Sequence, residues 1–141
     1  MKLTTKGRYA IIAMADLVLH SRTAPVSLKE ITNRQSISLS YLEQLFSKLK
    51  ETDLVRSVRG PGGGYQLGRD ASEISLLDII TAVDEKIDQT QCGGAMNCNK
   101  DHPCLTHYIW TELNEKINQY MRDITLSDIA TRDDVKNIMI F

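Results

Sequence analysis

The residues of this chain that could do chemistry lie in one short segment. All three cysteines lie between residues 91 and 107, and so do two of the three histidines, His102 and His107. The spacing Cys-x5-Cys-x5-Cys-x2-His places three thiols and an imidazole between residues 92 and 107. Thiolate sulfur and imidazole nitrogen suit zinc or an iron–sulfur cluster. The segment therefore predicts a metal or cluster site, although three incidental thiols remain the alternative.

The ligands that we expect are three thiolates and one imidazole: Cys92, Cys98, Cys104 and His107. We prefer His107 over the nearby His102 as the fourth ligand. Cys104 and His107 are three residues apart, so they share one face if the turn between them is helical. Structural zinc usually takes Cys-x2–4-Cys knuckles, which neither cysteine gap matches. A binuclear cluster distributes its ligands over two irons and fits wider spacing. The residues alone leave zinc and a cluster open.

An enzyme is the alternative from a different functional class. Cys104 with His107 could act as nucleophile and base, and Cys92 with Cys98 could act as a redox pair. The sequence offers no evident third group to orient the base and contains no Cys-x-x-Cys motif. We therefore expect a chain that is not an enzyme.

Three short motifs predict where helices begin. Residues 27–31 (SLKEI), 75–79 (SLLDI) and 125–129 (TLSDI) each place a carboxylate three positions after a hydroxyl residue. That pattern is typical of a capping box, in which both side chains bind free backbone N–H groups at a helix start. Ser40 and Glu43 form a further candidate pair of this kind.

The first half of the chain predicts a winged helix-turn-helix. Residues 28–51 divide into two short helices, the second with an apolar stripe. The sequence LVRSV then indicates a strand, RGPGGG a turn and YQLG a returning strand. The predicted fold is mainly α with a small β-hairpin wing. We expect residues 1–72 to form a DNA-binding domain and residues 73–141 to hold the cysteine loop and a dimerisation helix.

A long helix is predicted near the end of the sequence. Apolar residues repeat every three or four positions, and Trp110 and Tyr120 widen the stripe, which consists of Ile109, Leu113, Ile117, Met121 and Ile124. Such a face needs a partner, because helix propensity alone seldom suffices. The chain's own core and a symmetric homodimer contact both remain open.

The charge is unevenly distributed along the chain. Residues 1–69 carry 11 lysines and arginines against 5 acidic residues, while residues 70–141 carry 6 against 13. A basic front half suggests a polyanion partner such as double-stranded DNA, although it is also compatible with a solvated surface. We expect the protein in a reducing cytoplasm with no membrane partner, because no export signal is evident and Asp16 interrupts the first apolar run.

Residues at the start of the second short helix are the candidates for reading DNA bases: Ser38, Ser40, Tyr41, Glu43 and Gln44. Gln44 can bridge the donor and acceptor of adenine. Glu43 is repelled by phosphates but can accept from cytosine, so it could act as a filter against other sequences. Its alternative role is the capping partner of Ser40.

Further DNA contacts are expected outside that helix. Arg59 lies at the tip of the proposed wing, where it could enter a minor groove or be an ordinary exposed turn residue. Nonspecific phosphate contacts are expected from Lys2, Thr4, Lys6 and Arg8, each of which could equally be plain surface. The glycine-rich turn is not a nucleotide-binding loop, because no Gly-Lys-[Ser/Thr] follows it.

Several of these segments together resemble one known family. KGRYAIIAM, ISLSYLEQLFSKL, VRSVRGPGGGYQLGRDA, AVDE and CLTHYIW closely resemble the iron–sulfur cluster regulators of the IscR family. The resemblance extends from about Lys2 to the ITLSDI segment, with matching order and cysteine spacing. The departures are the loop filler, GGAMN and NKDHP, and the residues after Ile129.

The resemblance implies a bacterial, homodimeric winged-helix transcription factor that controls cluster-biogenesis genes. It implies one 2Fe–2S cluster per protomer, held by Cys92, Cys98, Cys104 and His107 and supplied by the cluster-assembly machinery. In such regulators the loaded form typically represses the cluster-assembly operon, and the cluster-free form still binds another class of site. By the same resemblance, the filter role of Glu43 is favoured.

Overall fold

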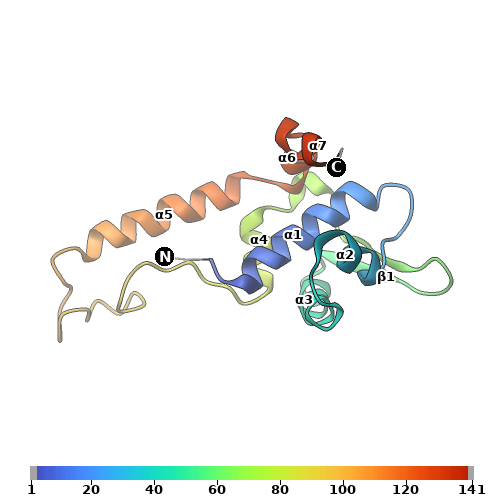
Figure 1. Ribbon diagram of the computed structural model, residues 1–141. Helices are drawn as coiled ribbons and strands as arrows, with labels where there is room; N and C mark the ends of the chain where they lie inside the picture. The colour runs from blue at the N-terminus through green and yellow to red at the C-terminus, as the bar shows by residue number, and fades with distance from the viewer. Residues whose placement is uncertain (1–2, 140–141) are drawn as a thin grey trace.

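The computed structural model describes residues 3–139, so that Lys2, one of the expected phosphate contacts, lies outside the described residues. Most of the chain is helical, and one two-stranded antiparallel hairpin follows the third helix (Figure 1). The elements in chain order are α1 (Thr5–His20), α2 (Leu28–Gln35), α3 (Leu39–Glu51), β1 (Val55–Val58), β2 (Gly64–Leu67), the 3-10 helix η1 (Ala71–Glu73), α4 (Leu76–Ala82), α5 (His107–Asp123), α6 (Leu126–Thr131) and α7 (Asp133–Met139). The predicted class, mainly α with a small β-hairpin wing, is confirmed.

All three predicted capping boxes are present. Ser27 and Glu30 begin α2, Ser75 and Asp78 begin α4, and the same reciprocal pair of bonds begins α6 at residues 125 and 128. In each box the hydroxyl accepts from the backbone N–H three residues later, and the carboxylate accepts from the N-cap N–H. Each helix start thus satisfies donors that would otherwise remain free.

The fourth candidate cap was wrong. The N-cap of α3 is Ser38, whose hydroxyl accepts from the Tyr41 amide at 3.3 Å, and Ser40 lies inside the helix. The extended backbone of Ser38 suits an N-cap, which has non-helical dihedral angles. Glu43 is therefore not the capping partner of Ser40 and lies exposed on α3.

A single hydrophobic core joins the two halves of the chain. Met14 and Leu17 of α1 pack with residues from α2, α3, α4 and α6, and the largest fully buried side chains also include Ile31, Leu42, Phe46, Leu49, Ile79 and Leu126. Burying such aliphatic and aromatic side chains contributes about 1.5–3 kcal/mol each. The helix-turn-helix is therefore positioned by the helices that follow it as well as by α1.

The wing is attached to the body by backbone and aromatic contacts. β1 pairs with β2 in the register Val55↔Leu67 to Val58↔Gly64, and Tyr65 also exchanges backbone hydrogen bonds with Val26 at 2.7 and 2.9 Å. At Gly64 a Cβ would lie 2.4 Å from the Val26 carbonyl oxygen, so no larger residue fits this approach. The hairpin is consequently fixed relative to the helix-turn-helix.

An ion pair fastens α2 to α1. The Asp16 carboxylate is 2% exposed and accepts two hydrogen bonds from Arg34, at 2.8 and 2.9 Å, and a third from Gln35 at 2.9 Å. Burial opposes ionisation of Asp16, but the hydrogen bonds from Arg34 and Gln35 outweigh it and hold the pKa of that carboxyl below its usual value. The first helix of the helix-turn-helix is thereby held in a fixed orientation.

The predicted long helix is α5, which projects from the body (Figure 1). Its C-terminal end is anchored where α4 and α6 begin: the Leu76 amide donates to Ile124 O and the Leu126 amide to Ile74 O, both at 2.9 Å. Towards its other end α5 exposes apolar side chains. Within residues 3–139, no helix has both the length and the apolar character needed to cross a membrane.

Candidate metal centre and nucleic-acid interface

The cysteine segment lies at the outer end of α5, away from the body (Figure 1). His107 is the first residue of α5 and only 4% exposed, and its amide donates to the Cys104 carbonyl at 3.2 Å. Thr106 is the N-cap residue, but its side chain makes no capping bond. The turn that ends the loop therefore fixes the imidazole directly at the start of the helix.

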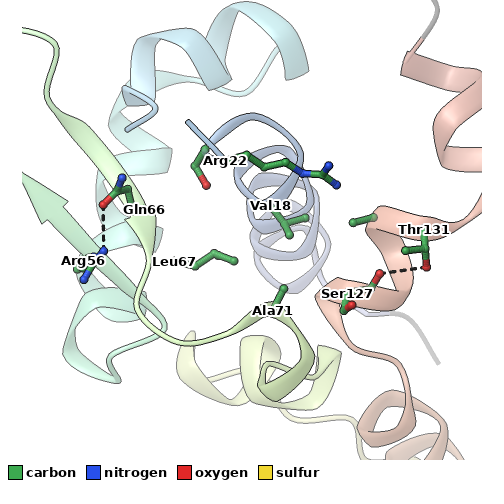
Figure 2. A pocket seen from close by; sticks show the side chains of 10 residues that line it. Val18, Arg22, Arg56, Gln66, Leu67, Ala71, Ser127 and Thr131 are labelled. Atoms are coloured by element: carbon green, nitrogen blue, oxygen red, sulfur yellow. Dashed lines mark hydrogen bonds between the residues drawn. The ribbon is translucent and has the colours of Figure 1, made fainter. Parts of the chain in front are cut away.

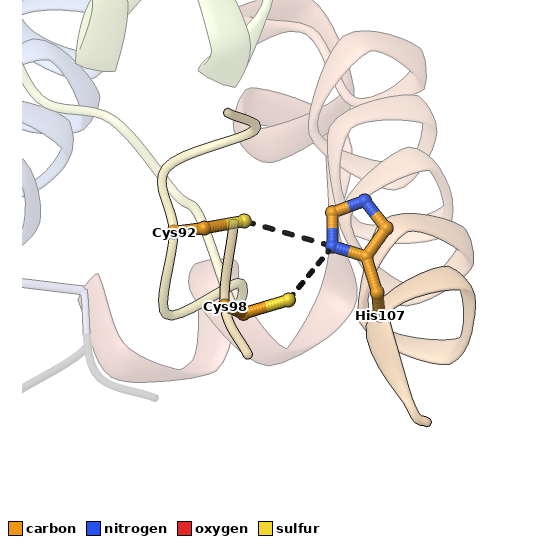
Figure 3. A group of neighbouring side chains, drawn as sticks. All are labelled: Cys92, Cys98 and His107. Carbon is orange, nitrogen blue, oxygen red and sulfur yellow. Dashed lines mark hydrogen bonds between the residues drawn. The ribbon is translucent and has the colours of Figure 1, made fainter. Parts of the chain in front are cut away.

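Two of the thiols converge on the imidazole. The Cys92 Sγ lies 3.6 Å and the Cys98 Sγ 3.5 Å from His107 Nδ1, and the three candidate ligand atoms all lie within 4.8 Å of one another (Figure 3). Ligand atoms of a tetrahedral zinc or iron site lie about 3.3–3.8 Å apart, given metal–ligand bonds of about 2.0–2.3 Å. Residues fifteen positions apart thus meet as a metal site requires.

Cys104 lies beside this group but not within it. Its amide donates to the Cys98 Sγ at 3.0 Å, and its own Sγ contacts the Thr106 hydroxyl at 3.7 Å. Cys104 shares a pocket of about 290 Å³ with Cys98 and His107; the lining residues are Thr90, Gln91, Cys98, Cys104, Thr106, His107 and Trp110. Three of the four expected ligands form one compact group, and the fourth lines the adjoining pocket.

His102, the alternative ligand, is turned away. Its side chain is exposed, and its Nδ1 lies 2.9 Å from the carbonyl oxygen of Pro103. It is not a member of the group formed by Cys92, Cys98 and His107. The geometry favours His107 over His102.

The thiols differ in acidity because they share protons and backbone donors. Burial opposes ionisation of Cys92, but N–H groups of Gly94 and Met96 outweigh it and lower the pKa of its thiol to about 6. For Cys98, the Cys104 amide favours the thiolate, yet burial and the neighbouring thiols raise the pKa overall. The side chains of Cys98 and Thr106 lower the pKa of Cys104. A thiolate forms readily in this loop, as ligation of a metal requires.

The expected base-reading residues lie at the start of α3, and all of them except Tyr41 are exposed. Ser40, Glu43 and Gln44 are exposed on one face of the helix and line a shallow groove of about 610 Å³. Tyr41 is half-buried and packs edge-on against Tyr9 of α1, with ring centroids 5.8 Å apart. Most of its ring thus supports the helix.

The remaining expected contacts surround that face. Arg59 is exposed in the turn between β1 and β2, and Arg8 is exposed on α1. Lys6 is half-buried, and the Thr4 amide, at the N-cap of α1, donates to the Glu85 carboxylate at 2.7 Å. A basic wing tip and the exposed face of α3 belong to the same winged helix-turn-helix.

The sequence reading missed Lys48. It lies one helical turn after Gln44, lines the same groove on α3, and its ammonium contacts the Asp84 carboxylate. The spacing of four from Gln44 is a signal that could have placed Lys48 on the face of α3 that carries the expected base contacts. The contact with Asp84, which is 36 residues away, could not be read from spacing.

A second pocket, of about 430 Å³, lies between α1, the wing and α6 (Figure 2). Arg56 donates to the Gln66 side-chain oxygen at 3.2 Å on one side, and Arg22 extends away from it on the other. Thr131 donates to the Ser127 carbonyl within its own helix. The charged groups around this pocket do not converge on one point.

Comparison with known proteins gives one consistent picture. Residues 3–132 match the Rrf2 family model, described as an iron-dependent transcriptional regulator. The chain is 55% identical over 135 residues to the HTH-type transcriptional regulator IscR of Serratia proteamaculans. The aligned segment covers 96% of this chain and 82% of that protein. A second regulator of that name, from Yersinia pseudotuberculosis, is 52% identical over 138 residues, 98% of this chain and 84% of the relative.

Comparison with solved structures leads to the same family of regulators. IscR of T. potens superposes with a TM-score of 0.74 and 37% identity, covering 92% of this chain and 85% of that one. CymR, described as the global cysteine regulator of B. subtilis, gives a TM-score of 0.81 with 32% identity over 93% of this chain and 97% of its own. These relatives are DNA-binding transcriptional regulators and not enzymes, so the thiol-enzyme alternative is excluded. The chain belongs to the Rrf2 family of iron-dependent transcriptional regulators.

Proposed function

We propose that this regulator senses iron–sulfur cluster status through one 2Fe–2S cluster per protomer and thereby controls cluster-biogenesis genes. The observation that carries the proposal is the convergence of Cys92, Cys98 and His107 at the start of α5, with Cys104 in the adjoining pocket. The relatives named IscR support the same assignment.

The donor set fits a 2Fe–2S cluster. Three thiolates and one imidazole give such a cluster its four terminal ligands, two for each iron. Because the irons are separate, the four ligands need not lie at the corners of one tetrahedron, and the offset of Cys104 from the group of three agrees with this. Zinc held by the group of three is the rival occupant, and a thiol-redox response is the other alternative.

When bound, the cluster supplies a redox-active group whose loss leaves four side chains without their common partner. The chain itself holds the loop against α5: Asn114 accepts from the Gln89 amide at 2.7 Å and donates to Asp88 at 2.9 Å. His107, buried at the helix start, then fixes one ligand to α5 and leaves the cysteines on the loop. Ligation would therefore order the loop against the helix.

The DNA interface follows from the winged helix-turn-helix. In the proposal, the first turns of α3 enter the major groove, where Ser38, Ser40, Tyr41, Glu43 and Gln44 approach base edges. Arg59 enters an adjacent minor groove, and phosphate contacts come from Lys2, Thr4, Lys6 and Arg8. Glu43, free of any capping role, acts as the sequence filter.

The two parts of the chain have separate roles in the assembled regulator. Residues 1–72 provide DNA binding, and residues 73–141 provide the cluster loop and, through α5, a homodimer contact. The exposed apolar side chains of α5, including Tyr108 at 62% and Ile109 at 57%, support a contact between two copies. We expect the cluster to come from the cluster-assembly machinery of a reducing cytoplasm.

The direct test is anaerobic loading with iron and sulfide. The wild-type protein should bind two irons and two sulfides per chain and show the visible absorption of a 2Fe–2S cluster, and Cys98→Ala should lose both. A matched control is Met96→Ala, an exposed residue of the same loop, which should load normally. Colourless protein with one tightly held zinc per chain, lost in Cys98→Ala, would contradict the cluster assignment.

A further inference from the structure

Two consecutive carboxylates stand at the base of the cysteine loop and contact two different DNA-facing elements. Asp84 Oδ2 accepts from the Lys48 ammonium of α3 at 2.5 Å. Glu85 Oε1 accepts from the Thr4 amide at the N-cap of α1 at 2.7 Å. These pairs join residues 36 and 81 positions apart, and they connect the end of α4 to two of the elements that carry expected DNA contacts.

Glu85 is built into the body of the protein. It is only 8% exposed, and its backbone amide donates to the Ile80 carbonyl at 2.9 Å, which fixes it to α4. A Cβ added at Gly7 would lie 3.1 Å from its Cγ, so α1 and the Glu85 side chain are in close contact. A carboxylate at this place binds a free N–H and complements the positive end of the helix dipole.

Asp84 is equally constrained by its backbone. Its φ of 60° lies in the left-handed region, and its amide donates to the Thr81 carbonyl at 3.1 Å. The side chain is thereby aimed at Lys48, whose neighbours along the groove on α3 include Gln44 and Glu43. Asp84 thus holds a cation on the very face that is expected to meet DNA.

The other end of this connection is the cysteine site. Beyond Glu85, residues 86–91 lead to Cys92, and within them Asp88 and Gln89 are both bonded to Asn114 of α5. A short segment with contacts at both ends therefore separates the metal ligands from the two carboxylates. A change in the position of the loop acts on Asp84 and Glu85 through only a few peptide units.

We propose that Asp84 and Glu85 are positioning residues that convey the state of the Cys92 loop to α3 and to the N-terminus of α1. The inference rests on the proposed sensing function. With the loop ordered, Asp84 directs the Lys48 ammonium and Glu85 holds the first turn of α1. With the loop released, both contacts loosen, and α3 and α1 meet DNA differently. Coupling requires such differential contacts in the two states.

The expected effect is small for each contact, because Lys48 and Asp84 are 41% and 70% exposed and exposed ion pairs are weak. The informative quantity is a ratio of two affinities for the same cluster-assembly operator. The affinity of the loaded protein is divided by the affinity of the same protein after cluster removal. Asp84→Asn should bring this ratio about 2- to 5-fold closer to one. Asn tolerates the left-handed backbone, so the substitution removes the charge without new strain.

Further variants distinguish coupling through these contacts from a general effect on the stability of the fold. Lys48→Gln should bring the ratio towards one to the same extent, and Asp84→Asn added to it should change nothing more. Lys48→Arg, which retains the ion pair, should keep the wild-type ratio. Glu85→Gln should raise amide hydrogen exchange in the first turn of α1 in loaded protein. Asp134→Asn, which removes the exposed ion pair between Arg132 at the end of α6 and Asp134 of α7, is the matched control and should leave the ratio unchanged.

The outcomes are distinguishable. If wild-type protein shows a ratio of one, the sensing function itself fails and this inference fails with it. If the wild-type ratio differs from one but Asp84→Asn and Lys48→Gln both keep it, with normal visible spectra, only the role of these residues is overturned. Independent, additive effects of the two substitutions would equally overturn it.

Discussion

Glu43 is the residue to which the proposed function assigns a choice between DNA sequences. The sequence alone allowed two roles for Glu43, the capping partner of Ser40 or a filter against some DNA sequences. The structure shows that Ser38 is the N-cap of α3, so Glu43 has no capping role. An exposed carboxylate facing a polyanion lowers affinity unless a base donates to it, and the cytosine amino group is such a donor. In the proposed interface, the negative charge of Glu43 would therefore penalise sites that offer no donor.

Glu43→Ala should broaden the set of bound operators, with affinity for disfavoured sites rising about 10-fold and thermal stability unchanged. A selection from random DNA, followed by binding titrations, measures this. Glu51→Ala makes the same charge change at the end of α3 and should leave the selected sequences alone. If Glu43→Ala lowers the melting temperature and leaves the selected set unaltered, its role is structural.

Asp16 illustrates a residue whose charge stabilises the fold. Its pKa is lower in the folded than in the unfolded chain, whose value is about 3.9. The ionised pair with Arg34 therefore stabilises the protein above that value, and the contribution is lost as pH falls through the folded pKa.

Asp16→Asn should lower the free energy of unfolding by about 2–3 kcal/mol at neutral pH, because it leaves a partly buried Arg34 without its carboxylate. Urea titrations at several pH values should show a shallower loss of stability below about pH 4 than in the wild type. Asp134→Asn, at an exposed pair, serves as the control. Parallel curves for Asp16→Asn and wild type would refute this linkage.

At the scale of elements, local patterns predicted what local forces determine. The capping boxes at residues 27, 75 and 125 were confirmed, because a hydroxyl and a carboxylate three residues apart satisfy the same helix start that they define. The error at Ser40 arose because serines stand at both 38 and 40, and only the backbone conformation decides which one is the cap. The wing and α5 were likewise predicted from turn residues and apolar spacing.

Long-range contacts could not be predicted from spacing. The pairs Lys48–Asp84 and Thr4–Glu85 depend on how α4 packs against α1 and α3, which is a property of the whole core. The same holds for the metal site: the sequence predicted four ligands, but the conformation of the loop against the start of α5 decides that Cys92 and Cys98 meet His107 while Cys104 lies beside them. Residue types indicate the chemistry, and packing sets its geometry.

Helix α5 has an apolar face that its own chain covers only in part. Met121 is buried, whereas Ile109 and Tyr120 are 57% and 63% exposed. A helix of this length without a partner on one face is marginal in water, and a second copy of α5 would supply that partner. Exposed apolar side chains thus lie near both ends of α5.

Ile109→Glu should convert the dimer to monomer at micromolar concentration, because it places a charge in the centre of the proposed contact. Sedimentation velocity measures the change. Ile138→Glu makes the same substitution on α7, at a side chain 70% exposed, and should remain dimeric. A wild-type protein that is monomeric would exclude the dimer contact. An Ile109→Glu variant that stays dimeric would place the contact elsewhere on the chain.

For the whole molecule, the proposed sensing site and the proposed DNA-reading site lie in different places. The cysteine loop is at the outer end of α5, and α3 and the wing are on the body (Figure 1). Communication between them requires a physical connection and two arrangements that bind DNA with different free energy. The short segment from Cys92 back to Asp84 is the connection that the contacts support.

The most direct test measures which operators are bound by loaded protein and by the same protein after cluster removal, with Cys98→Ala as the form that cannot load. The account predicts two different sets, with cluster-assembly operators bound more tightly by the loaded form and Cys98→Ala matching the cluster-free set. Identical sets for all three preparations would contradict it and leave a DNA-binding regulator that does not respond to the cluster.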